Sequence, residues 1–216
     1  MKISVIIPVH NEEAIIGKTI KAIKRCPPSN KEVLVILNGC TDHSEKVAKW
    51  AGADVYSLRV GNVSRARNTG AKKAKGNILV FHDADTLVSE NYLQEILKAV
   101  EEGYAYGCAR QIPETKNFWY GLVVKIANKA SRENRIFHGN FFITKDLFGR
   151  SGGFNPEIKR FEDTDLSKRL RGRGMFKYIT KAWIRPSERK FKKNGYFNSF
   201  LSLVIAGRNK KVFKTK

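Results

Sequence analysis

The chain has 216 residues, 42% of them hydrophobic, which is enough for one domain with a sizeable core. Its formal net charge is +21, of which residues 109–216 carry +18, so the second half predicts a surface for an anionic partner. Three cysteines without a C-x-x-C pair indicate neither a disulfide framework nor a zinc knuckle.

Apolar runs of strand length alternate with helical patterns along the first hundred residues. We expect strands at residues 3–8, 33–37, 55–60 and 78–81. Helices are expected at residues 13–25, 64–75 and 92–100, and a further short helix should follow residue 42, with Thr41 or Asp42 as its cap. Gly76 should close the helix at 64–75. This alternation predicts an α/β fold with a mostly parallel sheet and right-handed crossovers.

Two carboxylates follow the expected strand at residues 78–81. Asp83 and Asp85 are two positions apart and should point the same way, at the edge where such sheets bind ligands. A small number of hard oxygen ligands suits Mg²⁺ or Mn²⁺ that also holds substrate phosphates. The alternative explanation of this D-x-D pattern is a turn or a helix cap after the strand, because Asp is favoured in both places.

Six pieces of the sequence occur in the order expected of family 2 glycosyltransferases: residues 4–13, 38–42, 66–70, 83–85, 152–154 and 162–163. The chain therefore resembles that family over roughly residues 2–190. The resemblance implies a GT-A-like, mostly parallel nucleotide-binding sheet in a single domain at 1–190, followed by a basic, aromatic-rich segment at 191–216. It also implies transfer of a sugar from a nucleotide diphosphate donor with inversion at the anomeric carbon.

By this resemblance, Asp83 and Asp85 would hold Mn²⁺ or Mg²⁺, with Asp83 contacting metal or ribose, and the ion would stabilise the departing diphosphate. The donor-binding residues implied are Pro8, His10, Glu12, Asn38, Arg65, Arg67, Asp83 and Arg189. Pro8 would mainly shape the exit of the strand. The alternatives are that Glu12 belongs to the first turn of a helix and that the arginines are solvated surface residues, although function better explains Arg67 beside Asn68.

Asn38 stands where many family members have an aspartate that binds the base. An amide oxygen still accepts from a uracil N–H, whereas guanine, with adjacent donors, would prefer a carboxylate. This favours a UDP-sugar and leaves a GDP-sugar as the alternative. Asn38 is equally well explained by a turn conformation alone.

The resemblance assigns the general base to Asp163, which would take the proton from the acceptor hydroxyl. Leu166 and Leu170 are spaced as the buried side of a helix, so Asp163 would lie in its first turn, facing the crevice. Its neighbour Glu162 would position the acceptor or raise the pKa of that base. The acceptor region implied comprises His138, Gly139, Asn140, Gly153, Phe154 and Glu162.

We expect a hydroxyl on a glycan or a lipid-linked acceptor, with polyprenyl phosphate as the alternative. The absence of a Q-x-x-R-W element after Asp163 favours transfer of a single sugar over polymerisation. A nucleotidyltransferase would need a glycine-rich phosphate loop after the first strand, and residues 8–12 lack one. A noncatalytic basic module for membrane or nucleic acid would not need the ordered acidic residues, so no nucleic-acid partner is expected.

We expect a cytoplasmic protein, because no signal peptide precedes residue 3 and the apolar stretch at 200–206 is too short to span a bilayer. Residues 185–216 contain ten basic residues and one acidic residue, interleaved with aromatic and aliphatic side chains. This composition predicts peripheral association with an anionic inner membrane surface, or else a final helix packed on the domain.

Overall fold

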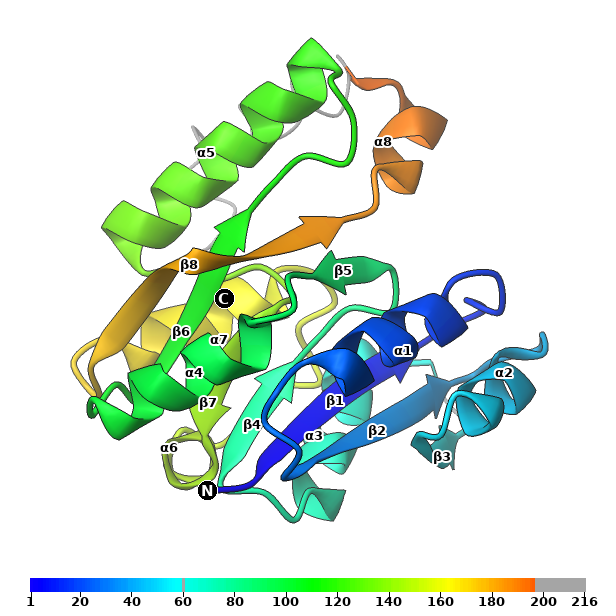
Figure 1. Cartoon of the computed structure of the whole chain (residues 1–216), viewed down its shortest axis with the longest axis horizontal. Coiled ribbons are helices and arrows are strands. Elements are labelled where there is room, and N and C mark those ends of the chain that lie inside the picture. Colours follow the sequence, from blue (N-terminus) through cyan, green and yellow to red (C-terminus); the bar gives the residue numbers. More distant parts are fainter. Residues whose placement is uncertain (60, 197–216) are drawn as a thin grey trace.

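One sheet of eight strands organises residues 1–59 and 61–196, the part of the chain that the computed structural model describes (Figure 1). The strands are β1 (Ile3–Val9), β2 (Lys31–Asn38), β3 (Asp54–Leu58), β4 (Ile78–Phe81), β5 (Thr86–Val88), β6 (Tyr106–Gln111), β7 (Phe141–Thr144) and β8 (Phe176–Pro186). The helices are α1 (Ile16–Arg25), α2 (Ser44–Trp50), α3 (Val63–Lys73), α4 (Tyr92–Glu101), α5 (Phe118–Asn134), α6 (Lys145–Arg150), α7 (Glu162–Leu170) and α8 (Arg189–Asn194).

The strands are ordered β3-β2-β1-β4-β7-β6-β8-β5. β1 pairs in parallel with β2 and β4, and β2 pairs in parallel with β3, so four consecutive strands of the sheet point the same way. β7 is antiparallel to both β4 and β6, and β5 is antiparallel to β8. The expected α/β fold with a mostly parallel sheet flanked by helices is confirmed, and β7 and β5 add antiparallel pairings that the sequence pattern did not indicate.

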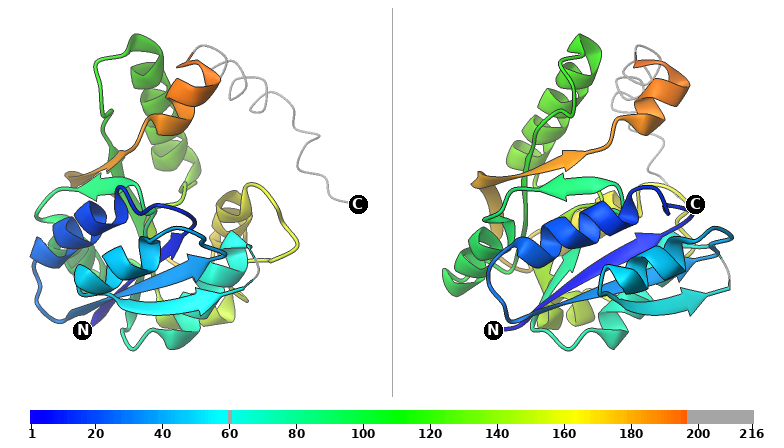
Figure 2. Two further views of the ribbon diagram at one scale, coloured as in Figure 1. Left: turned by 90° about the vertical axis from the view of Figure 1, so that its right-hand side faces the viewer. Right: turned by 45° about the vertical axis from the view of Figure 1, so that its right-hand side comes forward.

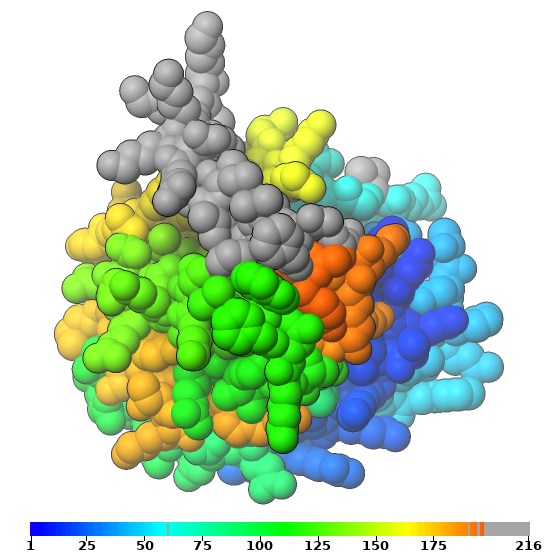
Figure 3. All heavy atoms as spheres, turned by 90° about the horizontal axis from the view of Figure 1, so that it is seen from above, coloured from blue at the N-terminus to red at the C-terminus, as the bar shows by residue number. Residues whose placement is uncertain are grey.

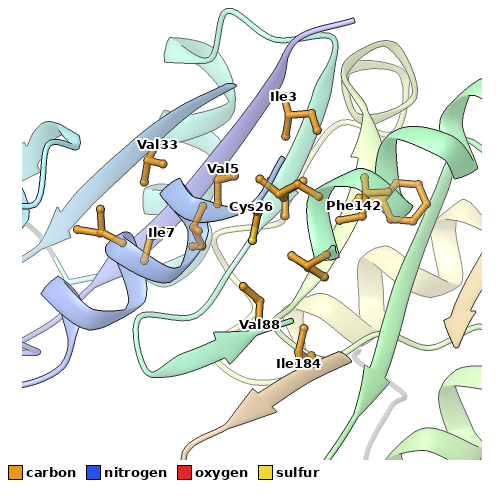
Figure 4. Close-up of a cluster of buried hydrophobic side chains, with 14 of the residues drawn as sticks. Ile3, Val5, Ile7, Cys26, Val33, Val88, Phe142 and Ile184 are labelled. Atoms are coloured by element: carbon orange, nitrogen blue, oxygen red, sulfur yellow. The ribbon is translucent and has the colours of Figure 1, made fainter. Parts of the chain in front are cut away.

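The sheet is buried on both faces, as its unbroken apolar strands predict. Ile3, Val5 and Ile7 of β1 point to the face covered by α1 and α4 (Figure 4). Ile6, between them in sequence, points to the opposite face, which α3 and an aromatic cluster around Phe81 cover. The central strand is therefore fixed from both sides, which holds the ends of β1 and β4 in place.

Most expected elements are present with shifted ends. α1 begins at Ile16, three residues later than expected, because residues 12–15 first form a turn in which the N–H of Ile16 bonds the carbonyl of Glu12 at 2.9 Å. α2 begins at Ser44 with His43 as its N-cap, so neither Thr41 nor Asp42 is the cap, although Asp42 Oδ1 accepts a hydrogen bond from the N–H of Ser44 at 3.0 Å. Residues 102–161, for which the sequence pattern gave no elements, hold β6, α5, β7 and α6.

Gly76 has a different role from the one expected. α3 already ends at Lys73, and Ala74 is its extended C-cap, so the assignment of Gly76 as the residue that closes the helix is wrong. Gly76 lies instead against the start of β1, where its N–H donates to Ser4 Oγ at 2.8 Å. A Cβ at this position would lie 2.6 Å from the Lys2 carbonyl oxygen, so the close approach of two backbones requires glycine.

α8 crosses the expected boundary at residue 190, and residues 197–216 of the expected membrane-binding segment lie outside the described part of the chain. Two further views show α5 and α8 standing at one end of the molecule, away from β1 to β3 (Figure 2). Within the described residues, no helix combines the length and the apolar character needed to cross a bilayer.

The first prediction uses two glycines with opposite surroundings. Gly76→Ala should lower the free energy of unfolding by about 1–3 kcal/mol, because the added methyl group displaces the start of β1. Gly149→Ala is the matched control, since no heavy atom lies within 4 Å of a Cβ there and alanine favours its helix. Urea unfolding of both variants measures the difference, and equal midpoints would contradict the close-approach account.

Candidate active site

A cleft of about 610 Å³ opens at the carboxyl ends of β1, β2 and β4. Of the residues expected at the site, those that line it are Pro8, His10, Glu12, Asn38, Arg67, Asp83, Asp85, His138, Gly139, Asn140, Glu162 and Asp163. They come from segments far apart in sequence, and the parallel strands bring the earlier ones to a single edge. The structure thus gathers most of the expected donor, metal and acceptor residues around one cavity.

Four expected residues are not among those that line the cleft: Arg189, which contacts the lining residues Glu12 and Asp85 from α8, and Arg65, Gly153 and Phe154. Arg65 is exposed on α3 and lines a separate hollow with Lys72. Phe154 is 2% exposed and packs in the aromatic core beneath Arg67. Gly153 lies beside it with φ of +68°, where a Cβ would meet Asn68 Oδ1 at 2.8 Å. Gly153 and Phe154 therefore pack against Asn68 and Arg67 of α3 on the side away from the cleft.

Arg67 on α3 is the central ion-pairing residue of the cleft. Its side chain is 4% exposed, and its Nη1 donates to Glu162 Oε1 at 2.6 Å. Its Nη2 donates to Asp83 Oδ1 at 3.3 Å, and its guanidinium lies 5.2 Å from the centre of the Phe154 ring. A buried charge needs such partners, and these two carboxylates come from the segment after β4 and from α7. Arg67 therefore joins the two sides of the cleft.

Asp83 is held from a second direction by the segment before β7. Asn140 Oδ1 accepts from the Asp83 N–H at 2.9 Å, and Asn140 Nδ2 donates to Asp83 Oδ2 at 3.1 Å. Gly139 has φ of +66°, and a Cβ there would lie 2.1 Å from Asp83 Oδ2. These two residues, expected on the acceptor side, therefore also fix the carboxylate expected on the donor side.

Asp163 lies in the first turn of α7, as expected. The N–H of Gly139 donates to its Oδ2 at 2.9 Å, and the N–H of Thr164 donates to its Oδ1 at 2.7 Å. The side chain is partly exposed and lines the cleft. The Thr164 hydroxyl also donates to Oδ1 at 3.4 Å, whereas Oδ2 keeps a second lone pair, so Asp163 is held in place and its Oδ2 can accept a further hydrogen bond.

Arg189 reaches the site from α8. Its guanidinium bonds Glu12 and approaches Asp85 Oδ2 at 3.3 Å, and the hydrogen bond and charge of Glu12, followed by those of Asp85, raise the pKa of Arg189. The N–H of Ser187 donates to the carbonyl of Asp85 at 3.2 Å. Glu12, Asp85 and Arg189, which the sequence separates widely, are therefore neighbours.

Asn38 and His10 are tied into the loops that they begin. Asn38 Oδ1 accepts from the N–H of Asn62 at 2.6 Å, which fixes the start of α3. His10 Nδ1 lies 2.8 Å from the Asn38 carbonyl oxygen, so this nitrogen carries the proton. The Asn38 amide thus has a structural bond in addition to its place in the cleft lining.

Two carboxylates, Asp83 and Asp85, offer hard oxygen ligands to a cation in the cleft. Across residues 1–59 and 61–196, no three His, Cys, Asp or Glu side chains converge as a metal site. This set fits Mg²⁺ or Mn²⁺, which are typically held by one or two carboxylates while substrate phosphates and water complete the coordination. His82 is fully buried, burial lowers the pKa of its imidazole, and its Nε2 bonds the Thr86 carbonyl, so it is a core residue.

Gln111 and Pro186 also line the cleft, although no sequence pattern indicated them. Gln111 ends β6, and both its N–H and its carbonyl are bonded by the Asn128 side chain of α5 at 2.8 and 2.9 Å. The Pro186 carbonyl accepts from the Tyr120 hydroxyl at 2.8 Å. These contacts attach α5 to the margin of the cleft.

The fold is similar to that of GT-A α/β proteins, and comparisons with known proteins agree. The sequence profile of Glycosyl transferase family 2 matches residues 4–158, so the chain belongs to this family. The expected resemblance is thereby confirmed.

Among relatives, glycosyltransferase AglE of Haloferax volcanii is 35% identical over 191 residues, which cover 80% of this chain and 62% of AglE. Glycosyltransferase GlyA of Streptococcus pneumoniae is 32% identical over 106 residues, which cover 47% of this chain and 15% of GlyA. The chain therefore spans less than two thirds of the length of these relatives.

Among solved structures, S. aureus TarS 1-349 in complex with UDP-GlcNAc superposes with a TM-score of 0.74 at 17% identity, over 95% of this chain and 66% of that one. The mannosyltransferase PcManGT from Pyrobaculum calidifontis, in complex with GDP-Man and Mn²⁺, gives a TM-score of 0.68 at 18% identity, over 95% of this chain and 64% of that one. At this level of identity the similarity establishes the fold.

A second prediction follows from the burial of Arg67. Arg67→Met should lower the free energy of unfolding by about 3–5 kcal/mol, because it leaves Glu162 and Asp83 without their shared cation. Arg65→Met, two residues earlier on the exposed side of α3, should stay within about 0.5 kcal/mol of the unsubstituted protein. Thermal and urea unfolding give both values. Similar small losses in the two variants would show that the paired charges do not stabilise the cleft.

Proposed function

We propose that the chain is an inverting glycosyltransferase that moves one sugar from a nucleotide diphosphate donor to a hydroxyl acceptor on a glycan or lipid-linked molecule. The observation that carries this proposal is the shared cleft, which Asp83 and Asp85 line after β4 and Asp163 lines from α7. Family membership supports the same activity. Complexes of fold neighbours with UDP-GlcNAc and GDP-Man support a nucleotide-sugar as the donor.

On the donor side, Asp83 and Asp85 would hold Mg²⁺ or Mn²⁺, and the ion supplies positive charge that stabilises a departing diphosphate when it is bound. The residues themselves prepare this position. Asn140 and Arg67 fix Asp83, while the Arg189 guanidinium lies against Asp85 and Glu12. A donor diphosphate attracts the same guanidinium, so Arg189 can exchange its carboxylate contacts for phosphate oxygens.

The base of the donor would lie near Asn38, where β2 ends at the cleft. Its Oδ1 bonds the Asn62 N–H and keeps one further lone pair, which suits a single donor such as the uracil N–H. Two adjacent donors of guanine fit this amide less well. We therefore favour a UDP-sugar over a GDP-sugar.

On the acceptor side, Asp163 acts as the general base. The N–H groups of Gly139 and Thr164 hold its carboxylate in place, so it accepts the proton of the acceptor hydroxyl as that oxygen attacks the anomeric carbon. Attack opposite the diphosphate inverts the configuration of the sugar. Glu162 is engaged by Arg67, so we assign it a place beside the acceptor rather than the role of base.

The third prediction concerns the donor and its cation. With Mn²⁺ present, a UDP-sugar at about a hundred times its Kd should stabilise the protein by about 2.7 kcal/mol against thermal unfolding. Asp85→Asn should remove most of this protection and abolish turnover while leaving the unliganded fold intact. Asp54→Asn, at an exposed position of β3, serves as the control. Full protection or activity in excess chelator, or an unaffected Asp85→Asn variant, would overturn the metal assignment.

The fourth prediction concerns the acceptor. Asp163→Asn should reduce turnover with a hydroxyl acceptor by about 10²- to 10⁴-fold, because a positioned base contributes that much. Donor protection against unfolding should remain, since the variant retains the donor side. A polyprenyl phosphate is already ionised near neutral pH, so turnover with that acceptor should fall much less, and efficient turnover of it by the unsubstituted protein would favour the phosphate over a hydroxyl. Near-normal transfer to a hydroxyl would remove Asp163 from the role of base.

A further inference from the structure

α5 presents an unusual outer face beside the cleft. Phe118 is 73% exposed and Ile126 is 44% exposed, with the partly exposed Leu122 between them. Positions 118, 122 and 126 fall on one side of a helix, so the three side chains form an apolar row over two turns. Of the exposed large hydrophobic residues in the described part of the chain, only those of α5 occur as a pair on one helix.

A basic row adjoins the apolar one. Lys125, Lys129 and Arg132 are all exposed and share a side of the same helix at i, i+4 and i+7. From Lys116 to Arg132 the sequence contains four basic residues and no acidic one, and Glu133 is the single acidic residue of α5. An apolar row flanked by lysine and arginine is the pattern of a helix that lies in the plane of an anionic membrane surface.

The opposite side of α5 is anchored to the protein. Tyr120, Val123, Val124 and Ser131 are buried, and the Asn128 side chain bonds both backbone groups of Gln111. Tyr120 donates to the Pro186 carbonyl and its ring lies 5.1 Å from that of Phe191 in α8. The outward row is therefore carried by a fixed helix, and Figure 3 shows the surface of α5, in green, beside that of α8, in orange.

We propose that the outer face of α5, formed by Phe118, Leu122 and Ile126 with Lys125 and Lys129, is a surface that docks on an anionic phospholipid bilayer. The apolar row enters the boundary between headgroups and acyl chains, and the lysines extend to the lipid phosphates. The net charge of +21 matches this partner, whereas a second copy of the chain would bring the same charge against itself. The docking itself does not depend on the proposed transferase activity.

The outer face of α5 lies close to the margin of the cleft, which affects how an acceptor could reach the cleft. Gln111 and Pro186, which α5 holds, both line the cleft, so docking through α5 would place the cleft margin close to the bilayer. An acceptor embedded in the membrane would then reach Asp163 without leaving the lipid. This link to the acceptor rests on the proposed function.

Cosedimentation of the whole chain with vesicles tests the proposal. Vesicles of phosphatidylcholine with about 30% phosphatidylglycerol should bind the protein, and binding should weaken between about 0.05 and 0.5 M salt. Phe118→Ser with Ile126→Ser should weaken binding at least about tenfold, because two inserted side chains are lost. Lys125→Gln with Lys129→Gln should weaken it by roughly fivefold per lysine and reduce the salt dependence.

Matched controls separate this face from other surfaces. Trp50→Ser with Met175→Ser removes two exposed apolar side chains elsewhere, and Lys18→Gln with Lys21→Gln removes two exposed lysines of α1. Both should bind vesicles like the unsubstituted protein. All variants should keep their thermal unfolding midpoint, and Phe118→Ser with Ile126→Ser should keep donor protection, so failure here is distinct from failure of the catalytic proposal.

Three outcomes would overturn the proposal. They are absence of vesicle binding at low salt, unchanged binding by Phe118→Ser with Ile126→Ser, and a dimer in sedimentation velocity that this same variant dissociates. The second outcome would place membrane binding on a part of the chain other than α5, and the third would assign the face of α5 to a second copy of the chain.

Discussion

The buried guanidinium of Arg67 is the interaction on which the cleft depends. It lies between Glu162 at the start of α7 and Asp83 after β4, and neither carboxylate would be stable so close to the other without a cation between them. The guanidinium in turn packs on Phe154, which belongs to the aromatic core beneath the site. The donor and acceptor sides are thus connected through one side chain with little freedom to move.

The reversal of chain direction at β7 explains how the second set of residues reaches this point. β7 is antiparallel to β4, and Phe141 pairs with Phe81. The residues just before β7 therefore lie beside those just after β4, which brings Gly139 and Asn140 against Asp83. The same short segment gives the Gly139 N–H to Asp163. One antiparallel pairing consequently positions both carboxylates.

The sequence predicted the parts of this arrangement that depend on local pattern. The apolar composition of β1, β2 and β4 indicates buried strands. The acidic pair directly after β4 was expected at the ligand-binding edge of the sheet because it follows the end of a strand. The first turn of α7 was likewise placed correctly by the spacing of Leu166 and Leu170. The order of the expected strands and helices, together with the family motifs, was enough to predict the fold and most of the residues that line the cleft.

What the sequence did not reveal depends on contacts between distant segments. No local pattern distinguishes a buried arginine from a solvated one, so the ion pairs of Arg67 became visible only when α3, β4 and α7 were placed together. The sequence placed Gly139 only on the acceptor side. Its close approach to Asp83 results from the pairing of β7 with β4, which no local pattern indicates. Gly76 was misassigned for the same reason, since its constraint comes from β1 and not from the helix before it.

A double-mutant cycle on Arg67 and Glu162 tests the central claim that this ion pair joins the two sides of the cleft. The free energy of unfolding is measured for Arg67→Met, for Glu162→Gln and for the double variant. The account predicts strong coupling, with the double variant losing less than the sum of the single losses by more than about 1 kcal/mol. Arg67→Met leaves the buried Glu162 charge without its cation, and the added Glu162→Gln change removes that unpaired charge. Losses that add to within about 0.5 kcal/mol would show that the two residues act independently and would contradict the account.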